Sequence, residues 1–183
     1  MRKIILNIAV SLDGYIEGPN GEYDWCFTDQ DYGMTAFYEQ TDALFIGRKS
    51  YALISDDASA FADKEVYVFS DTLTGEYPPN VEIISKGNYK GRIEDIRHQP
   101  GKNIWLFGGA DLISGFINNN FINEVVVSVH PVILGGGKAL FQHITGKIEL
   151  ELIKHEVFSS GLIQLTYTQK PRFDYSLLAG IKI

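Results

Sequence analysis

Apolar runs that alternate with amphipathic segments are the feature that most constrains the fold of this chain. Each run is rich in Ile, Val and Phe and is bounded by Gly, Pro, Asn, Asp or Ser, which is typical of β-strands. Segments with helical spacing lie between the runs, and this alternation predicts a largely parallel sheet. The predicted strands are residues 4–10, 43–47, 65–69, 81–84, 103–107 and 123–134, and the predicted helices are about 31–41, about 49–55, about 91–98 and 110–118.

The last part of the chain follows a different pattern. Residues 149–158 and 161–169 are two extended runs separated by a Ser-Ser-Gly turn, which predicts an antiparallel hairpin at one edge of the sheet. The expected fold class is therefore α/β, with helices on both faces of a mixed sheet. The chain shows no repeat or linker, so we expect one domain over residues 1–183. The sequence leaves open whether residues 171–183 form a strand, although their apolar content favours packing.

Charge and cysteine content exclude several classes of function. A formal net charge of −7 and a pI near 5.0 argue against a nucleic-acid partner, because phosphate backbones require a broad basic surface. Cys26 is the only cysteine, so an intramolecular disulfide and a thiolate-rich zinc site are excluded, and a reducing cytoplasm is favoured. The start of the chain is interpreted as a strand rather than a secretory leader, because Asn7 interrupts its apolar run. No apolar run is long enough to cross a membrane.

Ligands of open α/β sheets bind beyond the carboxyl ends of the strands, where backbone N–H groups of helices point outward. The first such junction is Gly47-Arg48-Lys49-Ser50. Its glycine would allow close approach of the backbone, and its cations and hydroxyl could bind phosphate oxygens. The alternative is an ordinary helix start with solvated cations.

A second junction, Gly108-Gly109-Ala110-Asp111, joins a predicted buried strand to a predicted helix. Bare amides at such a turn can bind a pyrophosphate. The spacing is not GxGxxG, so a simple tight turn is the alternative. Ser70, after the strand at 65–69, could lie near an adenosine or merely end a strand. Together the cationic and the glycine-rich junctions favour a dinucleotide.

The stretch HPVILGGGKALF at residues 130–141 admits two interpretations. Its glycines could hold an anion with Lys138 nearby, or they could form a mobile loop before a short helix. His130 is expected to be structural or exposed. The histidines show no metal-ligand spacing, so no metal site is expected.

Aromatic and acidic residues interleave in residues 23–38. The rings of Trp25, Tyr32 and Phe37 could stack on a flat heterocycle, although some rings of this stretch are expected in the core. Asp13, just before a glycine, is interpreted as a turn former. The remaining candidate acids are Asp24, Asp29 and Asp31.

The motifs, taken in order, resemble those of a known family. They are SLDGYIEGPNGEYDW, ALFIGRKSY, EVYVFSD, NIWLFGGADLI, INEVVVSVHPVILGGGKALF and GLIQLTY. This ordered set resembles the dihydrofolate-reductase-like proteins, and in particular the branch containing the reductase (C-terminal) domain of the bifunctional riboflavin-biosynthesis deaminase/reductase. The resemblance covers nearly the whole chain. It implies a three-layer α/β/α fold, with a mixed sheet of about eight strands ending in the antiparallel hairpin.

The resemblance also implies an activity and site residues. The activity would be NADPH-dependent reduction of a small planar heterocycle, pterin-like or pyrimidine-like, as in dihydrofolate reductase or 5-amino-6-(5-phosphoribosylamino)uracil reductase. The Gly108–Gly109 peptide would be cis. By this resemblance Ala9 and Ile16 would border the nicotinamide, Gly47, Arg48, Lys49 and Ser50 would hold the phosphates, Ser70 would lie along the adenosine, and Gly108, Gly109, Ala110 and Asp111 would meet the pyrophosphate.

The sequence leaves four questions open. Asp31 falls about where dihydrofolate reductases carry the acid that protonates the substrate, but it would equally cap the helix predicted at 31–41. The zinc-ligand motifs of the deaminase half are absent, so the substrate is not identified. The alternative function is a catalytically inactive nucleotide-binding sensor or assembly module. A homodimer is plausible because the hairpin leaves a sheet edge to be covered.

Overall fold

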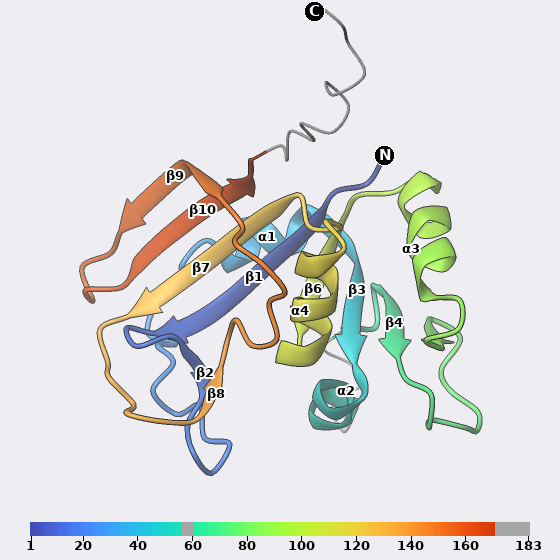
Figure 1. Cartoon of the computed structure of the whole chain (residues 1–183), viewed down its shortest axis with the longest axis horizontal. Helices are drawn as coiled ribbons and strands as arrows, with labels where there is room; N and C mark the ends of the chain where they lie inside the picture. Colours follow the sequence, from blue (N-terminus) through green and yellow to red (C-terminus); the bar gives the residue numbers. More distant parts are fainter. Residues whose placement is uncertain (56–60, 171–183) are drawn as a thin grey trace, which may run out of the picture.

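The computed structural model describes residues 1–55 and 61–170, and it is built on one large mixed sheet (Figure 1). The expectation for residues 171–183 lies outside the described residues. The eight strands follow the order β5-β4-β3-β6-β1-β7-β10-β9. Their bounds are β1 Ile4–Ser11, β3 Thr41–Gly47, β4 Glu65–Phe69, β5 Val81–Ile84, β6 Asn103–Gly108, β7 Glu124–His130, β9 Leu150–Val157 and β10 Ile163–Gln169.

The direction of the strands confirms the predicted mixed sheet. The six strands from β5 to β7 pair in parallel. The last two strands are antiparallel, with β10 paired to β7 and β9 paired to β10. The carboxyl ends of β3, β6 and β1 therefore lie side by side at one edge, where the following loops begin.

Helices cover both faces of the sheet and complete the predicted three layers. They are α1 Met34–Glu39, α2 Arg48–Ile54, α3 Tyr89–His98 and α4 Ala110–Asn118. The larger core lies under α3 and α4, where Ile96 and Phe116 pack with Phe45 of β3. Side chains alternate between the faces of a strand, so the next residue, Ile46, packs on the other face with residues of α2. The fold is the dihydrofolate-reductase-like α/β fold.

Three local expectations differ from the structure. The strand predicted at 123–134 ends at His130 of β7. Of the two interpretations of residues 130–141, the short helix is wrong, because residues 138–139 form β8 (Lys138–Ala139), which pairs with β2 (Tyr15–Glu17). This pairing joins segments far apart in the sequence, and no local pattern indicates it. Helix α1 begins only at Met34, because Tyr32 and Gly33 have φ angles of 51° and 77°, which a right-handed helix excludes.

Within the described ranges, no helix combines the length and the apolar character that a membrane span requires.

Candidate functional site

The two sequence-predicted junctions meet at the carboxyl edge of the sheet. Strands β3 and β6 are paired neighbours, so α2 and α4 begin beside each other. A Cβ on Gly109 would lie 3.3 Å from the Ser50 hydroxyl oxygen, and a Cβ on Gly47 would lie 3.5 Å from the Gly108 carbonyl oxygen. The two turns are therefore in van der Waals contact, and a side chain on Gly109 would crowd the Ser50 hydroxyl.

The glycine pair has the backbone geometry that the resemblance implied. Gly108 has a φ of 125°, which side-chain-bearing residues rarely adopt. The Gly108–Gly109 peptide is cis. Helix α4 follows directly, with Gly109 as its N-cap and no side chain bonded to that cap. The first amides of α4 are thus left without a side-chain acceptor from the cap residue.

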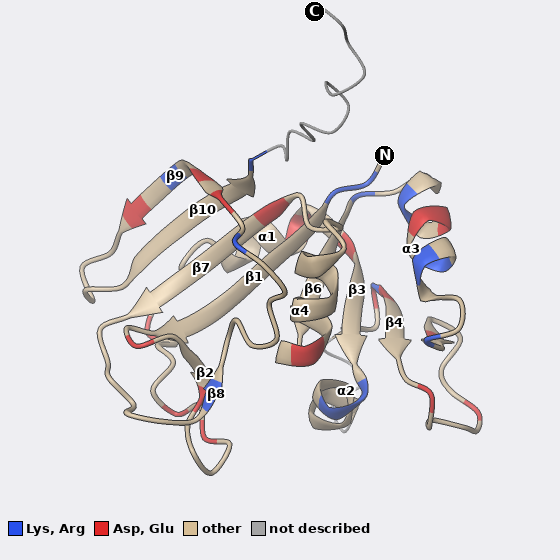
Figure 2. Cartoon of the chain, viewed as in Figure 1, with Lys and Arg blue, Asp and Glu red and all other residues tan. Residues whose placement is uncertain are grey.

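Two cations lie at the start of α2 (Figure 2). Arg48 and Lys49 are exposed, and neither forms an ion pair with any residue in the described part of the chain. Ser50, one residue further, is half-buried against Gly109. Exposed cations beside closely packed backbone amides fit the phosphates of a dinucleotide.

The residues that the resemblance assigns to the adenosine and to the nicotinamide lie on opposite sides of these turns. Ser70 follows β4, and its hydroxyl oxygen accepts hydrogen bonds from the amides of Thr72 and Leu73, both at 3.1 Å. Ala9 lies in β1, on the far side of β6 from β3, and is half-buried. Ile16 lies in β2 and packs against the main core. A ligand that crosses the strand ends from β4 to β1 would pass the ends of β4, β3, β6 and β1 in that order.

Asn7, which the sequence did not assign to the site, connects β1 to α1. Asn7, in the middle of β1, is half-buried, and its amide nitrogen lies 3.6 Å from the sulfur of Met34 in α1. The backbone carbonyl of Asn7 accepts a hydrogen bond from Trp105 Nε1 at 3.1 Å. Phe37 packs edge-on against the Trp105 ring at 5.3 Å. The available signal was the polar residue that interrupts the first apolar run.

The loop that precedes α1 is fastened to the ends of β7 and β10. Tyr32 is buried, and its hydroxyl donates to Asp29 Oδ1 at 2.6 Å and also lies 2.9 Å from Ser160 Oγ. Trp25 is half-buried and packs edge-on against the His130 ring at 5.2 Å. The rings of Trp25 and Tyr32 thus help to fix this loop, whereas Phe37 lies apart from them on α1.

His130 is buried and structural. Its Nδ1 donates to the Ser128 carbonyl at 3.0 Å, and its Nε2 accepts from the Phe27 amide at 3.1 Å. Each ring nitrogen therefore has a partner when the ring is neutral. Burial lowers the pKa of His130, which favours that neutral form.

Asp31 has the hydrogen bonds of a helix-terminus residue. Its Oδ1 accepts from the Thr35 hydroxyl at 2.6 Å and from the Thr35 amide at 2.9 Å. These bonds lower the pKa of Asp31 below its ordinary value. The arrangement supports the capping interpretation, although Gly33 is the N-cap residue itself. A proton-donating role for Asp31 stays a prediction.

The glycine-rich loop after β7 does bind an anion, and the anion is the carboxylate of Asp13. The amides of Leu134 and Gly135 donate to its two oxygens at 3.1 and 2.8 Å. The Ser11 hydroxyl donates at 2.7 Å and is the largest cause of the lowered pKa of Asp13. Lys138 is paired with Glu17, with Nζ and Oε1 2.5 Å apart. Asp13 thus does more than the predicted turn formation.

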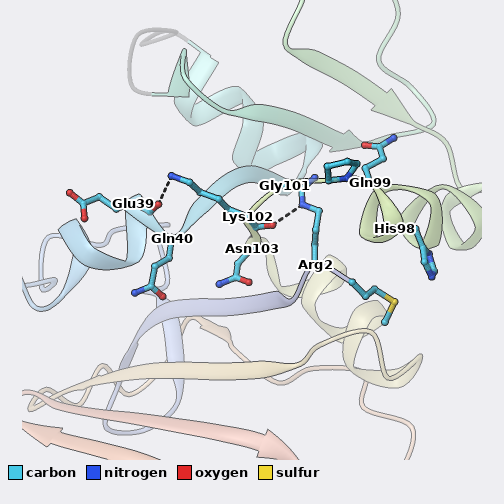
Figure 3. A pocket seen from close by; sticks show the side chains of 10 residues that line it. Arg2, Glu39, Gln40, His98, Gln99, Gly101, Lys102 and Asn103 are labelled. Carbon is cyan, nitrogen blue, oxygen red and sulfur yellow. Dashed lines mark hydrogen bonds between the residues drawn. The ribbon is translucent and has the colours of Figure 1, made fainter.

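A cavity of about 690 Å³ lies at the opposite, amino-terminal edge of the sheet (Figure 3). Its lining residues precede β1, β3 and β6. The Arg2 guanidinium pairs with Asp42 and donates to the Lys102 carbonyl, and Lys102 Nζ donates to the Glu39 carbonyl. These cations are already held by oxygens of the chain, and the cavity is remote from both junctions. The described residues contain no group of three or more His, Cys, Asp or Glu that could hold a metal ion.

Comparisons with known proteins agree with this geometry. The model of the RibD C-terminal domain family matches residues 2–164. The chain is 41% identical to the uncharacterized protein YyaP of Bacillus subtilis (strain 168) in an alignment of 179 residues, which covers 91% of this chain and 94% of YyaP. A crystal structure from Shewanella sp. PV-4, of a protein named for riboflavin biosynthesis, is 31% identical with a TM-score of 0.79 and covers 93% of this chain and 100% of that one.

Two more distant structures share the fold. The Thermotoga maritima diaminohydroxyphosphoribosylaminopyrimidine deaminase/5-amino-6-(5-phosphoribosylamino)uracil reductase is 16% identical with a TM-score of 0.72, covering 92% of this chain and 57% of that protein. Dihydrofolate reductase from Enterococcus faecalis, complexed with NADP(H), is 14% identical with a TM-score of 0.68, covering 92% and 97%. With its sheet order, its paired glycine turns and a family model that matches residues 2–164, the chain belongs to the RibD C-terminal domain family.

Proposed function

We propose that this chain is an NADPH-dependent reductase that transfers hydride to a C=N or C=O group of a small planar heterocycle, pterin-like or pyrimidine-like. Family membership and fold support the reductase type of function. One observation carries the proposal for the cofactor. The Gly47–Ser50 turn and the Gly108–Gly109 turn pack against each other and leave Arg48 and Lys49 exposed beside them.

In this proposal the cofactor runs along the strand ends. Arg48 and Lys49 bind the phosphates, including the adenosine 2′-phosphate, with Ser50 and the glycine amides as hydrogen-bond donors. Asp111 contributes through its backbone N–H, because its carboxylate would repel a pyrophosphate. The further contacts are Gly47, Gly108, Gly109 and Ala110 at the diphosphate, Ser70 at the adenosine, and Ala9 and Ile16 at the nicotinamide.

The substrate would bind between β1, α1 and the loop fastened by Tyr32. The bound cofactor supplies the hydride, and the protein orients the reactants and excludes water. Phe37 is the proposed stacking ring on α1, while Trp25 and Tyr32 shape the loop. Asp31 is the proton donor that the resemblance implies, and a water molecule is the other source.

The first experiment is a fluorescence titration of the purified protein with NADPH and, separately, NADH. Trp25 and Trp105 serve as reporters, since they lie in the loop and under Phe37. We expect micromolar NADPH binding with clear preference over NADH, followed by NADPH oxidation with pterin or pyrimidine acceptors. No binding of either nucleotide would refute the proposal.

A second candidate function is a nucleotide-binding module without catalysis. The hydrogen bonds that hold Asp31 as an ionised acceptor favour it. Such a protein would bind NADPH with the affinity expected above, and the bound NADPH would raise the melting temperature of the protein. It would oxidise NADPH with none of the acceptors, which separates the two functions.

We also propose that residues 1–183 act as one cytoplasmic domain and form a homodimer. Strand β9 is the outer strand of the sheet, and its exposed Leu152, Ile153 and Val157 support an interface there. Size-exclusion chromatography with light scattering should give twice the chain mass at micromolar concentration. A monomer would exclude the dimer without affecting the cofactor proposal.

A further inference from the structure

We infer that the substrate half of the site takes a heterocycle without a phosphate group and rejects a phosphorylated one. The inference rests on the proposed function and concerns the walls beyond the nicotinamide position. Those walls are β1 with its following loop, α1, and the loop between β7 and β8. Proteins hold phosphates with cations, with glycine-rich backbone amides or with helix amino termini. On the substrate side, groups of all three kinds have hydrogen-bond or ion-pair partners in the structure.

Cations are missing from most of these walls. No Lys or Arg occurs between Lys3 and Arg48, a stretch that contains eight Asp and Glu residues. Six of the eight lie between Asp13 and Asp31. Figure 2 shows acidic segments in the loops near β1 and β2, with a basic segment at β8. The basic segment is Lys138, brought there by the pairing of β8 with β2.

That lysine is already neutralised. Lys138 Nζ lies 2.5 Å from Glu17 Oε1, and both side chains are partly buried. The backbones of β8 and β2 lie very close at this point, which keeps Lys138 opposite Glu17. A Cβ on Gly137 would lie only 2.1 Å from the Glu17 carbonyl oxygen. Gly137 also has a φ of 128°, so only glycine brings β8 this close to β2.

Backbone amides and the helix terminus are occupied as well. The amides of Leu134 and Gly135, which could otherwise hold an anion, donate to Asp13. At the start of α1 the Thr35 amide donates to Asp31. Lys138 and the amides of Leu134, Gly135 and Thr35 are therefore each bonded to a carboxylate of the chain itself. A phosphate would have to displace a carboxylate and would meet the remaining negative charge.

The cofactor half has the opposite character, since Arg48 and Lys49 are exposed and without an ion pair in the described residues. The site thus separates an anion-binding half from an anion-rejecting half. This division distinguishes the chain from a reductase for 5-amino-6-(5-phosphoribosylamino)uracil, whose substrate carries a phosphate. An uncharged or cationic heterocycle is the class that the walls accept.

The test measures binding of 5-amino-6-(5-phosphoribosylamino)uracil and of the same compound without its phosphate to the protein saturated with NADP+. We expect the unphosphorylated compound to bind at least about tenfold more tightly, a difference of about 1.4 kcal/mol. The difference should shrink at high salt, because the rejection is electrostatic. Equal or tighter binding of the phosphorylated compound would overturn the inference, and so would binding of neither compound.

Glu17→Gln provides the matched variant, because it releases Lys138. The phosphorylated compound should then gain about threefold or more in affinity, with the other compound unchanged. Glu151→Gln, on the exposed strand β9, removes the same charge elsewhere and should change neither. Affinities for NADPH and NADH are measured on the same samples. If the nucleotides fail to bind, the proposed function fails; if they bind and the compound pair fails, only this inference does.

Discussion

The Ser50 hydroxyl oxygen lies 3.3 Å from the point where a side chain on Gly109 would begin. This proximity couples the start of α2 to the start of α4 across the paired strands β3 and β6. The cations follow one turn, and the first amides of α4, which have no side-chain cap, follow the other. A substituent at Gly109 would therefore push apart the two groups that are proposed to bind the phosphates.

The first prediction concerns Gly109→Ala. The added methyl group crowds Ser50, so we expect the affinity for NADPH to fall by about tenfold or more. Gly115→Ala is the control, because nothing lies within 4 Å of its Cβ position in α4. That variant should bind NADPH normally and gain about 0.5–1 kcal/mol in free energy of unfolding. Fluorescence titration and urea unfolding measure both, and normal NADPH binding by Gly109→Ala would contradict the proposed diphosphate site.

The second prediction concerns Arg48→Ala. If Arg48 binds the 2′-phosphate, its loss should raise the Kd for NADPH at least about tenfold, since a charge-assisted pair is removed. NADH lacks that phosphate, so its Kd should change by no more than about twofold. Lys154→Ala on β9, where the lysine pairs with Glu156, controls for the loss of one positive charge. Equal losses for the two nucleotides would remove the phosphate assignment.

The strands were predictable because each apolar run is punctuated locally by turn residues. The pattern of runs does not specify their order in the sheet, and the resemblance alone implied the fold. The start of α1 shows a further limit. The helical spacing of the sequence predicts a helix from Asp31, but the positive φ angles of Tyr32 and Gly33 are incompatible with a helix, so α1 begins at Met34. Burial of the Tyr32 ring against Phe158 and the bond of its hydroxyl to the distant Ser160 stabilise a bulky residue in that conformation.

The candidate site divides in the same way. The two junctions of the proposed cofactor half could be predicted, because glycines and cations follow strands directly in the sequence. The contacts of the proposed substrate half could not be predicted, because they join distant segments. Asp13 was expected to form a turn, yet it holds the loop at Leu134 and Gly135. His130 accepts a hydrogen bond from Phe27, which is also distant in the sequence. Neither of these contacts could be recognised from the residues around it in the sequence.

The third prediction separates the two roles of Asp31. The described bonds to Thr35 lead us to expect that Asp31→Asn leaves turnover within about threefold and lowers the melting temperature. Because the pKa of the folded state is lowered, the contribution of Asp31 to stability is present above about pH 4 and is lost as the pH falls further. Thr35→Val removes only the hydroxyl bond to Asp31 and keeps the amide bond, so it should produce a smaller thermal loss. A large fall in kcat for Asp31→Asn, with unchanged NADPH affinity, would instead identify the proton donor.

Burial of His130 makes the stability of this protein depend on pH. The neutral ring satisfies the Ser128 carbonyl and the Phe27 amide together. Protonation of Nε2 would replace an acceptor with a donor opposite the Phe27 N–H. This explains why the loop that carries Trp25 and Phe27 favours the neutral ring, in agreement with the lowered pKa.

The fourth prediction follows from that shift. The unfolded chain takes up the proton near the ordinary pKa of about 6.5 and the folded chain only at lower pH, so the free energy of unfolding should decline below about pH 6.5. The decline should end below the folded pKa, and above about pH 7.5 the contribution of His130 should be fully present and independent of pH. Urea unfolding across this range should show a shallower slope for His130→Gln. His155→Gln, at an exposed position of β9, should keep the slope of the unaltered protein. Equal slopes in all three proteins would show that His130 is not the group responsible.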